Sequence, residues 1–593
     1  MKRCLTLILL SLAAACSATA IDREAFTVTH YQLEVQIDRA SHVMAVTGRL
    51  TLRNDSKSPQ RFVPLQVSSS LSWNGIALDR KPVEWIGNDY TSDINHTGAL
   101  SEADVNLPRE VLPSGSITLD VQYGGTVTPD ATRFTRIGAP ADVALRNDWD
   151  QISEPFTALR GLGYVVWYPL SISAVSMSDG NAVFDAIDSW KFRHQRSEFD
   201  ARIQVISEDA KLCIAGSATT SSCGELGQTS DPRTGGRVNQ ISNSIHLSGM
   251  GQIVPTFAVA NYVQLDRPGI TLFHTPANTV FARDYAVAAE ANDSLLHEWL
   301  NPASQTTTVI ELTDPNANPY QNGAVLFTPL RQSQPATLEL LLMPVQVSAR
   351  FPTRRGWIEA GLQRFLQALS VEHRSGRKAA IQFLGEYLEP LVKTQASASA
   401  EQNAQGNTGD ANSANNALLN TSDEILLRGK GGFVFWMLRD MLGDTVLQHA
   451  LAAYRGGADV SPAYFQNLLE EGRKRDLEWF FDDWVYRDRG LPDFRVESAY
   501  ARPLLENPNK IILVTVTIEN RGGAGAEVPV MIQTPAGEKV LRVLAKAHQK
   551  ASGRLEVPAT PTRIVVNDGS VPETNFDDNT FDVPATPGPE NPG

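Results

Sequence analysis

The chain has 593 residues, of which 42% are hydrophobic and 20% charged, and its 66 acidic residues outnumber its 52 basic residues to give a formal net charge of -14. These values are typical of a multidomain globular protein and exclude both a disordered chain and a protein with many membrane spans. They also argue against a nucleic-acid partner, because an acidic surface repels the phosphate backbone.

Residues 1–20 have the features of an export signal rather than of a folded element. Lys2 and Arg3 precede the apolar run 5–12, which is too short to cross a bilayer as a mature helix. The small-x-small pattern at 18–20 is typical of a signal-peptidase site. We therefore expect this segment to be removed as a signal peptide.

The same segment supports a second interpretation. Residues 12–16 read Leu-Ala-Ala-Ala-Cys, which resembles a bacterial lipobox and would make Cys16 the lipidated first residue, in place of Ile21. Both interpretations predict an exported protein, located in the periplasm, on the outer membrane as a lipoprotein, or secreted. No later stretch of the sequence is long and apolar enough for a transmembrane helix, so the expected attachment to a membrane is a lipid anchor or none.

Residues 21–262 are predicted to form a strand-rich first domain. Apolar and polar residues alternate over 30–37, 44–52 and 117–123, and turn-forming residues separate the first two runs. Period-two alternation is typical of antiparallel strands with one buried face.

Cys213 and Cys223 are the two cysteines that follow the signal segment, and they flank a loop rich in Gly, Ser and Thr. Because an exported chain enters an oxidising compartment, we expect them to form one local disulfide. Two cysteines alone are too few ligands for a structural zinc site.

Residues 263–491 are predicted to form a mostly helical second domain. Ile358, Leu362, Phe365 and Leu369 recur at helical spacing, which indicates a helix with one face in a core. Further helices are expected at 286–300, 433–442, 446–454 and 477–485.

Residues 492–583 return to alternating patterns, at 510–518, 528–533 and 564–567, and predict a small β-sandwich. Two segments are expected to lack fixed structure. Residues 394–422 contain few large apolar side chains and bury too little surface to offset their ordering entropy, which predicts a flexible insertion. The tail 584–593 is rich in Pro and Gly.

Several short patterns occur in an order that resembles one known family. They are Trp-Tyr-Pro at 167–169, Tyr-Gln-Asn-Gly-Ala-Val-Leu-Phe at 320–327, Trp-Ile-Glu-Ala-Gly-Leu at 357–362, Lys-Gly at 430–431, and Phe-Phe-Asp-Asp-Trp at 480–484 followed by Gly-Leu-Pro at 490–492. Together they resemble the gluzincin (thermolysin-like) zinc aminopeptidases, to which membrane alanyl aminopeptidase belongs. The resemblance implies a multidomain α+β fold with an N-terminal antiparallel β-saddle, a thermolysin-like helical domain and a small C-terminal β-sandwich.

The zinc helix of that family carries His-Glu-x-x-His, in which two histidines bind zinc and the glutamate is the general base. None of the ten histidines of this chain lies one helical turn from another. Aligning the Trp357 pattern with members that have a short loop places Pro344 and Ser348 at the histidine positions and Val345 at the base. A longer spacing places Thr337 and Leu341 at the histidine positions instead.

The remaining site positions of the family also differ in this chain. Ala360 stands at the position of the third zinc ligand, with Glu359 one residue away, and Arg428 stands where members have a catalytic tyrosine. Leu326 replaces the glutamate of the substrate-edge strand. Segment 338–351 is then expected to be a buried apolar helix. The resemblance leaves Asn322, Gly323 and Ala324 as candidate residues lining an interdomain cleft.

These observations predict an exported, non-catalytic relative of the aminopeptidases, a pseudo-metallopeptidase without a cofactor, that binds a peptide or an envelope protein. The alternative is an active zinc metallo-aminopeptidase with atypical ligands. It would require His274, His297 or His373 to converge with carboxylates from distant segments.

Overall fold

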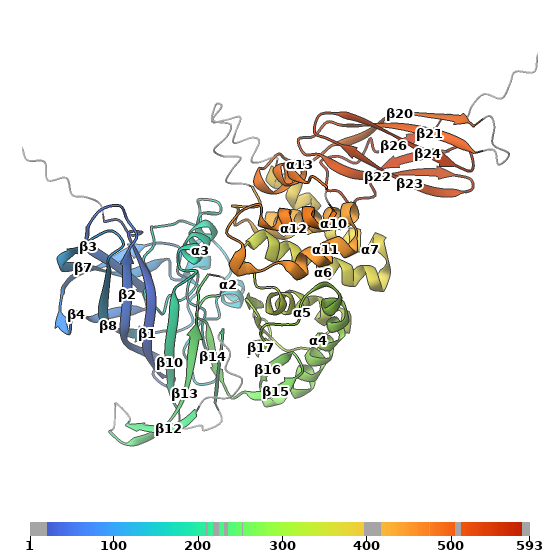
Figure 1. Cartoon of the computed structure of the whole chain (residues 1–593). Helices are drawn as coiled ribbons and strands as arrows, with labels where there is room; N and C mark the ends of the chain where they lie inside the picture. The colour runs from blue at the N-terminus through green and yellow to red at the C-terminus, as the bar shows by residue number, and fades with distance from the viewer. Residues whose placement is uncertain are drawn as a thin grey trace, which may run out of the picture.

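The computed structural model describes residues 21–207, 212–217, 225–230, 235–251, 253–395, 417–473, 475–504 and 511–583. Figure 1 shows three parts that follow one another along the chain: a β-rich N-terminal domain, a largely helical middle domain and a C-terminal domain of two sheets. The multidomain α+β class that the sequence predicts is confirmed.

An eight-stranded sheet is the main element of the first domain, with the strand order β12-β13-β10-β1-β2-β8-β4-β5. In β1, residues 31, 33, 35 and 37 are buried and residues 32, 34 and 36 are exposed, as the alternation predicts. β1 pairs antiparallel with β2 but parallel with β10, so the sheet is mixed. The bounds are β1 (Phe26–Asp38), β2 (Val43–Asn54), β4 (Leu71–Leu78), β5 (Lys81–Pro82), β8 (Ser116–Thr126), β10 (Glu198–Ile206), β12 (Glu225–Ser230) and β13 (Arg237–Leu247).

Two smaller sheets and three helices complete the described part of the first domain. One sheet has the order β3-β7-β6 and the other β11-β14-β9. The helices were not anticipated in this region. The bounds are β3 (Gln60–Ser68), β6 (Glu84–Thr91), β7 (Ala99–Val111), α1 (Thr132–Arg136), α2 (Ala141–Asn147), β9 (Thr157–Leu159), α3 (Ala182–Arg193), β11 (Cys213–Gly216) and β14 (Phe257–Ala260).

The middle domain begins with a five-stranded sheet of order β15-β16-β17-β19-β18 and continues as packed helices. α5 is buried over most of its C-terminal half and runs through Pro344, which confirms the expected apolar helix. The bounds are β15 (Val263–Arg267), β16 (Ile270–His274), η1 (Pro276–Asn278), α4 (Thr279–Trp299), β17 (Thr307–Glu311), β18 (Tyr320–Asn322), β19 (Val325–Thr328), α5 (Pro335–Arg350), α6 (Gly356–Ser375), α7 (Arg377–Gly385), η2 (Ile425–Lys430), α10 (Gly431–Leu442), α11 (Asp444–Ala453), η3 (Gly456–Ala458), α12 (Tyr464–Arg473), α13 (Glu478–Phe481) and η4 (Asp482–Tyr486).

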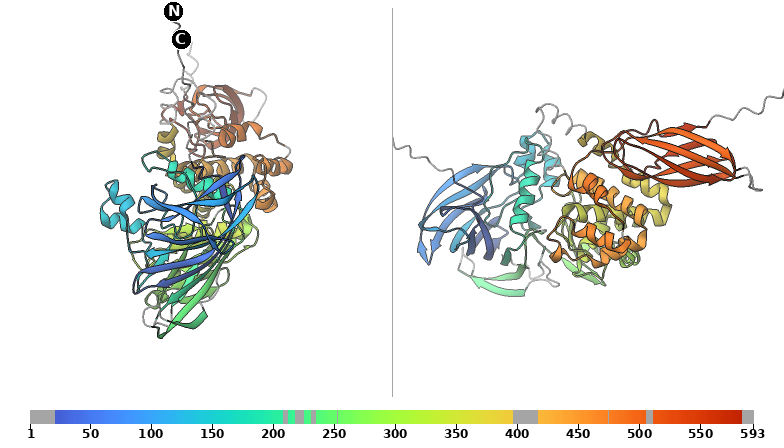
Figure 2. Two further views of the ribbon diagram at one scale, coloured as in Figure 1. Left: turned by 90° about the vertical axis from the view of Figure 1, so that its left-hand side faces the viewer. Right: turned by 45° about the horizontal axis from the view of Figure 1, so that its top comes forward.

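The C-terminal domain consists of a three-stranded sheet, β20-β21-β24, and a four-stranded sheet, β23-β22-β25-β26. Alternate residues of β21 and β22 are buried in one hydrophobic cluster that extends into the helical domain. Figure 2 shows that the helical domain lies between this domain and the N-terminal one. The bounds are β20 (Phe494–Pro503), β21 (Ile512–Asn520), β22 (Ala526–Thr534), β23 (Gly537–Ala545), β24 (Lys550–Val557), β25 (Arg563–Val566) and β26 (Thr580–Asp582).

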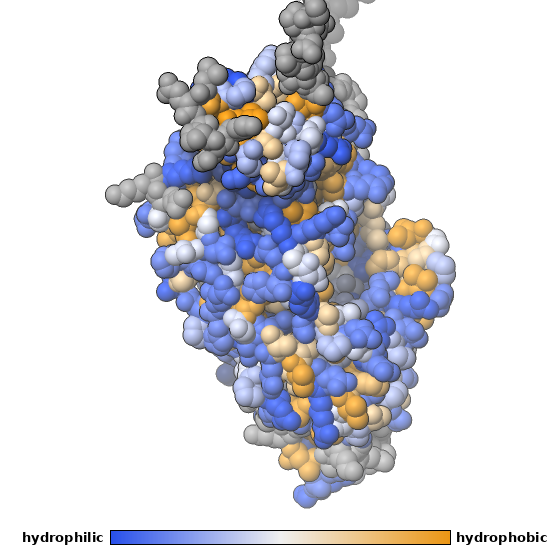
Figure 3. Space-filling view, turned by 90° about the vertical axis from the view of Figure 1, so that its right-hand side faces the viewer, coloured by the Kyte–Doolittle hydropathy of each residue, from blue (hydrophilic) through white to orange (hydrophobic). Residues whose placement is uncertain are grey.

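Some sequence-based expectations fall outside the described residues. They concern the signal peptide 1–20 with Cys16, the disulfide partner Cys223, and the tail 584–593. Of the insertion 394–422, the structure describes 394–395 and 417–422, where Leu418 is buried. No helix in the described part of the chain has the length and apolarity needed to cross a bilayer. The face drawn in Figure 3 is mostly hydrophilic, with apolar side chains in small scattered areas.

Candidate functional site

Ser348 is the centre of a polar network between α5 and α6. Its hydroxyl donates to Glu359 Oε1 at 2.8 Å, and Gln363 Nε2 donates to the Ser348 oxygen at 3.0 Å. Gln321 Nε2, from β18, donates to the same oxygen at 3.3 Å. We call Gln321, Ser348, Glu359 and Gln363 the Ser348 network. It joins the edge strand of the five-stranded sheet to the two helices on which the family resemblance places its zinc ligands.

The Glu359 carboxyl is held in a partly buried environment. Burial raises its pKa, while the hydrogen bond from Ser348 and the positive charges of Lys191 and Arg428 oppose that shift. Lys191 belongs to α3 of the first domain, so both domains contribute charge to this region. The network contains one carboxyl, one hydroxyl and two carboxamides. Such groups donate to and accept from the polar groups of a peptide.

The other predicted positions lie apart from this network. Pro344 and Val345 are buried within α5, and Ala360 packs against the hydrophobic cluster of the helical domain. Arg428, in the π-helical turn η2, pairs with Glu424 at 2.6 Å. Of the positions at which the family would need zinc ligands, Ser348 alone has a side chain that joins the network, and its hydroxyl is not among the usual zinc ligands.

Sequence reasoning missed the role of Glu359, which was set aside as one residue from the expected ligand position. In the structure it is Glu359, and not Ala360, that reaches Ser348. The connection between α5 and α6 spans only 351–355. One sequence signal could have revealed this contact. It is a serine near the end of one helix followed by an acid in the first turn of the next.

Asn322, Gly323 and Ala324 lie at the junction of the first two domains. Asn322 is buried, and its carboxamide accepts from Val254 N–H at 3.2 Å and donates to Val254 O at 2.8 Å. Ala324 is also buried. Gly323 adopts a φ of 58°, which favours glycine. That these residues line a ligand-binding cleft stays a prediction.

The histidines required by the alternative hypothesis do not meet carboxylates in a ligand-like group. His274 is buried, with Nδ1 2.8 Å from Thr275 O, while His297 and His373 are exposed. Among the described residues, the group of three possible metal ligands that does occur is His96, Asp148 and Asp150. It contains none of the histidines that the sequence suggested.

His96, Asp148 and Asp150 are fully buried in the first domain, and their nearest ligand-type atoms lie within 4.8 Å of one another. Arg160 occupies the same space, with Nη2 2.6 Å from Asp150 Oδ2 and 3.4 Å from Asp148 Oδ1. Arg133 Nη2 lies 3.7 Å from Asp148 Oδ1. Two guanidinium groups therefore already lie beside the two acidic side chains, and a divalent cation added here would meet strong repulsion. We call His96, Arg133, Asp148, Asp150 and Arg160 the Arg160 cluster. We interpret it as a buried cluster of ion pairs.

In the Arg160 cluster the aspartic acid has a higher pKa than the histidine, which is the reverse of their order in solution. Burial raises the pKa of Asp148 to about 7, with the two arginines opposing the shift. Burial lowers the pKa of His96 to about 4, and neither of its ring nitrogens has a hydrogen-bond partner. Between these values the unfolded chain carries a proton on His96, whereas the folded chain carries one on Asp148. The two effects on stability then nearly cancel.

Replacing either His96 or Asp148 should separate these two effects. The slope of the free energy of unfolding against pH should then have opposite signs in the two variants. In His96→Gln the raised pKa of Asp148 remains, so the folded state binds more protons and stability should fall as pH rises from about 4 to 7. In Asp148→Asn the lowered pKa of His96 remains, so stability should rise from about pH 4 to 6.5. We expect changes of about 3–4 kcal/mol in the free energy of unfolding, measured by denaturant titration across this range. Slopes of the same sign in both variants would contradict this assignment.

Cys213 is disulfide-bonded in the structure. It opens β11, which pairs with β14 in the small sheet at the domain junction. The partner proposed from the sequence, Cys223, lies outside the described residues.

No protein-family model and no curated protein matches the chain. Among solved structures, the M1 zinc metallopeptidase of Deinococcus radiodurans is similar at 14% identity and a TM-score of 0.48, over 79% of this chain and 96% of that one. A mutant of it bound to a Tyr-Ser-Ala substrate matches at 14% identity and a TM-score of 0.46, with the same coverage. A two-domain M1 zinc metallopeptidase mutant bound to L-arginine matches at 15% identity and a TM-score of 0.47, over 78% and 94% of the two chains. Likenesses of this size do not establish a shared activity.

Proposed function

We propose that the chain is an exported, non-catalytic relative of the gluzincin zinc aminopeptidases that binds a peptide or an envelope protein. The Ser348 network is the observation that carries this proposal. A catalytic zinc needs three protein ligands and an open position for water. Pro344, Val345, Ser348 and Ala360 supply no such ligand, and the carboxyl of Glu359 alone would leave two of the three ligand positions unfilled.

The same groups are suited to holding a peptide without cleaving it. Glu359 offers a carboxyl to a peptide ammonium, and the half-buried Gln321 offers its carboxamide to the peptide backbone. Lys191 and Arg428 lie close enough to act electrostatically on Glu359 and would favour an acidic residue further along the peptide. Export follows from the signal segment. The mass of the mature N-terminus decides between a start at Ile21 and a lipidated Cys16.

We expect the purified mature chain to bind labelled peptides with a free amino terminus and to leave them intact. Glu359→Ala should weaken binding about tenfold, because a hydrogen-bonded ion pair is lost. Fluorescence anisotropy gives the affinity, and mass spectrometry of the recovered peptide reports cleavage. Glu290→Ala, at an exposed position of α4, is the matched control and should bind as the wild type does. If Glu359→Ala and Glu290→Ala bound the peptides with equal affinity, Glu359 would not be part of the binding site.

A further inference from the structure

A long polar groove crosses the solvent-facing side of the eight-stranded sheet. It has a volume of about 1180 Å³ and is lined by residues of β13, β10, β1, β2, β8 and β4. At a strand spacing of about 4.8 Å, six strands give a width on the order of 24 Å. The opposite side of these strands packs into the core of the first domain. The groove is thus separate from the Ser348 network and does not depend on the function proposed above.

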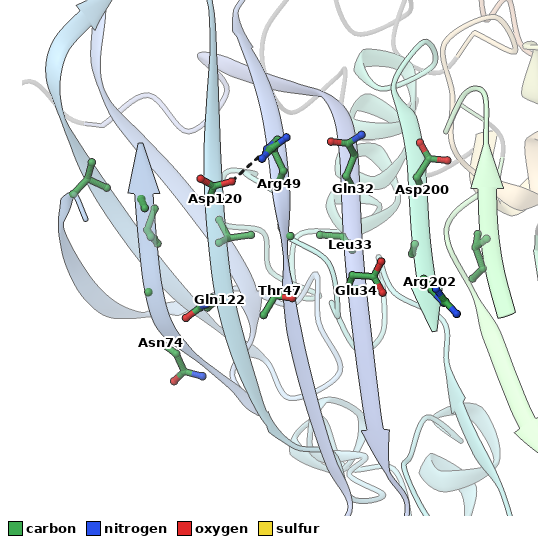
Figure 4. A pocket seen from close by; sticks show the side chains of 18 of the residues that line it. Gln32, Leu33, Glu34, Thr47, Arg49, Asn74, Asp120, Gln122, Asp200 and Arg202 are labelled. Carbon is green, nitrogen blue, oxygen red and sulfur yellow. Dashed lines mark hydrogen bonds and ion pairs between the residues drawn. The ribbon is translucent and has the colours of Figure 1, made fainter. Parts of the chain in front are cut away.

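Strand register arranges the lining side chains in two rows across the sheet, and Figure 4 labels the members of each row that lie on β10, β1, β2 and β8. Directly paired residues project from the same face, so each row is continuous over five strands. One row consists of Ser244, Arg202, Glu34, Thr47 and Gln122, and the other of His246, Asp200, Gln32, Arg49 and Asp120.

Most charged groups of the groove are already paired with one another. Arg49 Nε lies 3.3 Å from Asp120 Oδ1. Asp200 accepts from His246 Nδ1 at 2.6 Å and from His30 Nε2 at 2.8 Å. A ligand therefore meets a surface whose charges are largely neutralised.

Uncharged groups remain available for a ligand. Within the described residues, the carboxamides of Gln32, Asn74 and Gln122 make no hydrogen bond to the protein, and all three side chains are exposed. A carboxamide offers a donor and an acceptor side by side, which matches neighbouring sugar hydroxyls that each donate and accept. Trp85, a half-buried residue of β6, lies at one end of the groove. It presents an aromatic ring on which an apolar sugar face can pack.

We propose that this groove binds a neutral polysaccharide chain. A protein partner would require an apolar centre in its interface, whereas the side chains of both rows are polar or charged. A phosphate-rich polymer would be repelled by Glu34 and by the net charge of -14. The width over six strands suits an extended oligosaccharide rather than a single sugar.

The test is isothermal titration calorimetry of the full-length mature chain with neutral hexasaccharides from cellulose, chitin, amylose and mannan. At least one should bind, and the double variant Gln32→Ala/Gln122→Ala should weaken that binding about tenfold through the loss of two or more hydrogen bonds. The control Gln549→Ala removes an exposed carboxamide from the C-terminal domain and should leave the affinity unchanged.

Both substitutions of the double variant lie on the exposed face, so its thermal midpoint should match that of the wild type, which excludes loss of folding as the cause. The proposal is overturned if none of the four hexasaccharides binds, or if the double variant binds as tightly as the wild type. It is also overturned if the groove variants lose binding to a peptide or protein while no sugar binds.

Discussion

Replacing Arg160 with alanine is expected to destabilise the first domain by about 3–5 kcal/mol, because it leaves the buried carboxylate of Asp150 without its cation. Arg160 is 2% exposed. Its Nε donates to Asp150 Oδ2 at 2.7 Å, and its Nη2 donates to Asn147 O at 2.7 Å. The guanidinium also stacks over Tyr164, 3.3 Å from the ring centroid, and over Trp149 at 4.0 Å.

The loss should appear as an earlier unfolding transition in denaturant, followed by tryptophan fluorescence. Arg563→Ala is the matched control, since Arg563 and Asp582 form an exposed pair at 3.7 Å that should contribute less than about 1 kcal/mol. Adding Asp150→Asn to Arg160→Ala should recover part of the stability, because one uncompensated charge is removed. If Arg160→Ala cost no more than Arg563→Ala, the Arg160 cluster would not be a buried ion-pair system.

Trp167→Ala is expected to cost about 3–5 kcal/mol through the cavity that it leaves in the core of the first domain. Trp167 is 0% exposed, and its Nε1 donates to Pro255 O at 3.2 Å. Its ring meets Tyr168 at 5.2 Å, Phe257 at 5.3 Å and Phe199 at 5.7 Å between centroids, in edge-to-face geometry. This residue belongs to the Trp-Tyr-Pro pattern on which the resemblance partly rests.

Denaturant unfolding measures this effect as well. Phe192→Ala is the control, because Phe192 is 71% exposed and its loss should change stability by less than about 0.5 kcal/mol. Trp167→Phe keeps an aromatic ring in the cavity and should lose less stability than the alanine variant. If Trp167→Ala cost about as little stability as Phe192→Ala, the cavity would have collapsed or the Trp167 ring would pack elsewhere.

The sequence was most informative where a repeating pattern decides the structure. The alternation over 30–37 predicted β1, and the apolar spacing from Ile358 to Leu369 predicted α6. It was least informative for short strands buried on both faces. All five residues of β17 are buried, so this strand lacks alternation and was not predicted within a domain expected to be mostly helical.

Contacts between distant residues could not be derived from local patterns. The parallel pairing of β1 with β10 joins segments about 170 residues apart, as the pairing of His30 with Glu198 shows. The Arg160 cluster unites His96 with Asp148 and Asp150, and none of these residues lies in a recognisable motif. The contact between Ser348 and Glu359 depends on the short loop between α5 and α6, whose path the sequence does not specify.

The most direct measurement combines zinc content and peptide hydrolysis on the same purified mature chain. After incubation with equimolar zinc and desalting, we predict less than stoichiometric zinc by plasma mass spectrometry and no chelator-sensitive release of amino-terminal residues from peptides. Stoichiometric zinc that is lost in Ser348→Ala or Glu359→Ala, together with chelator-sensitive release of amino-terminal residues, would contradict the non-catalytic function proposed here.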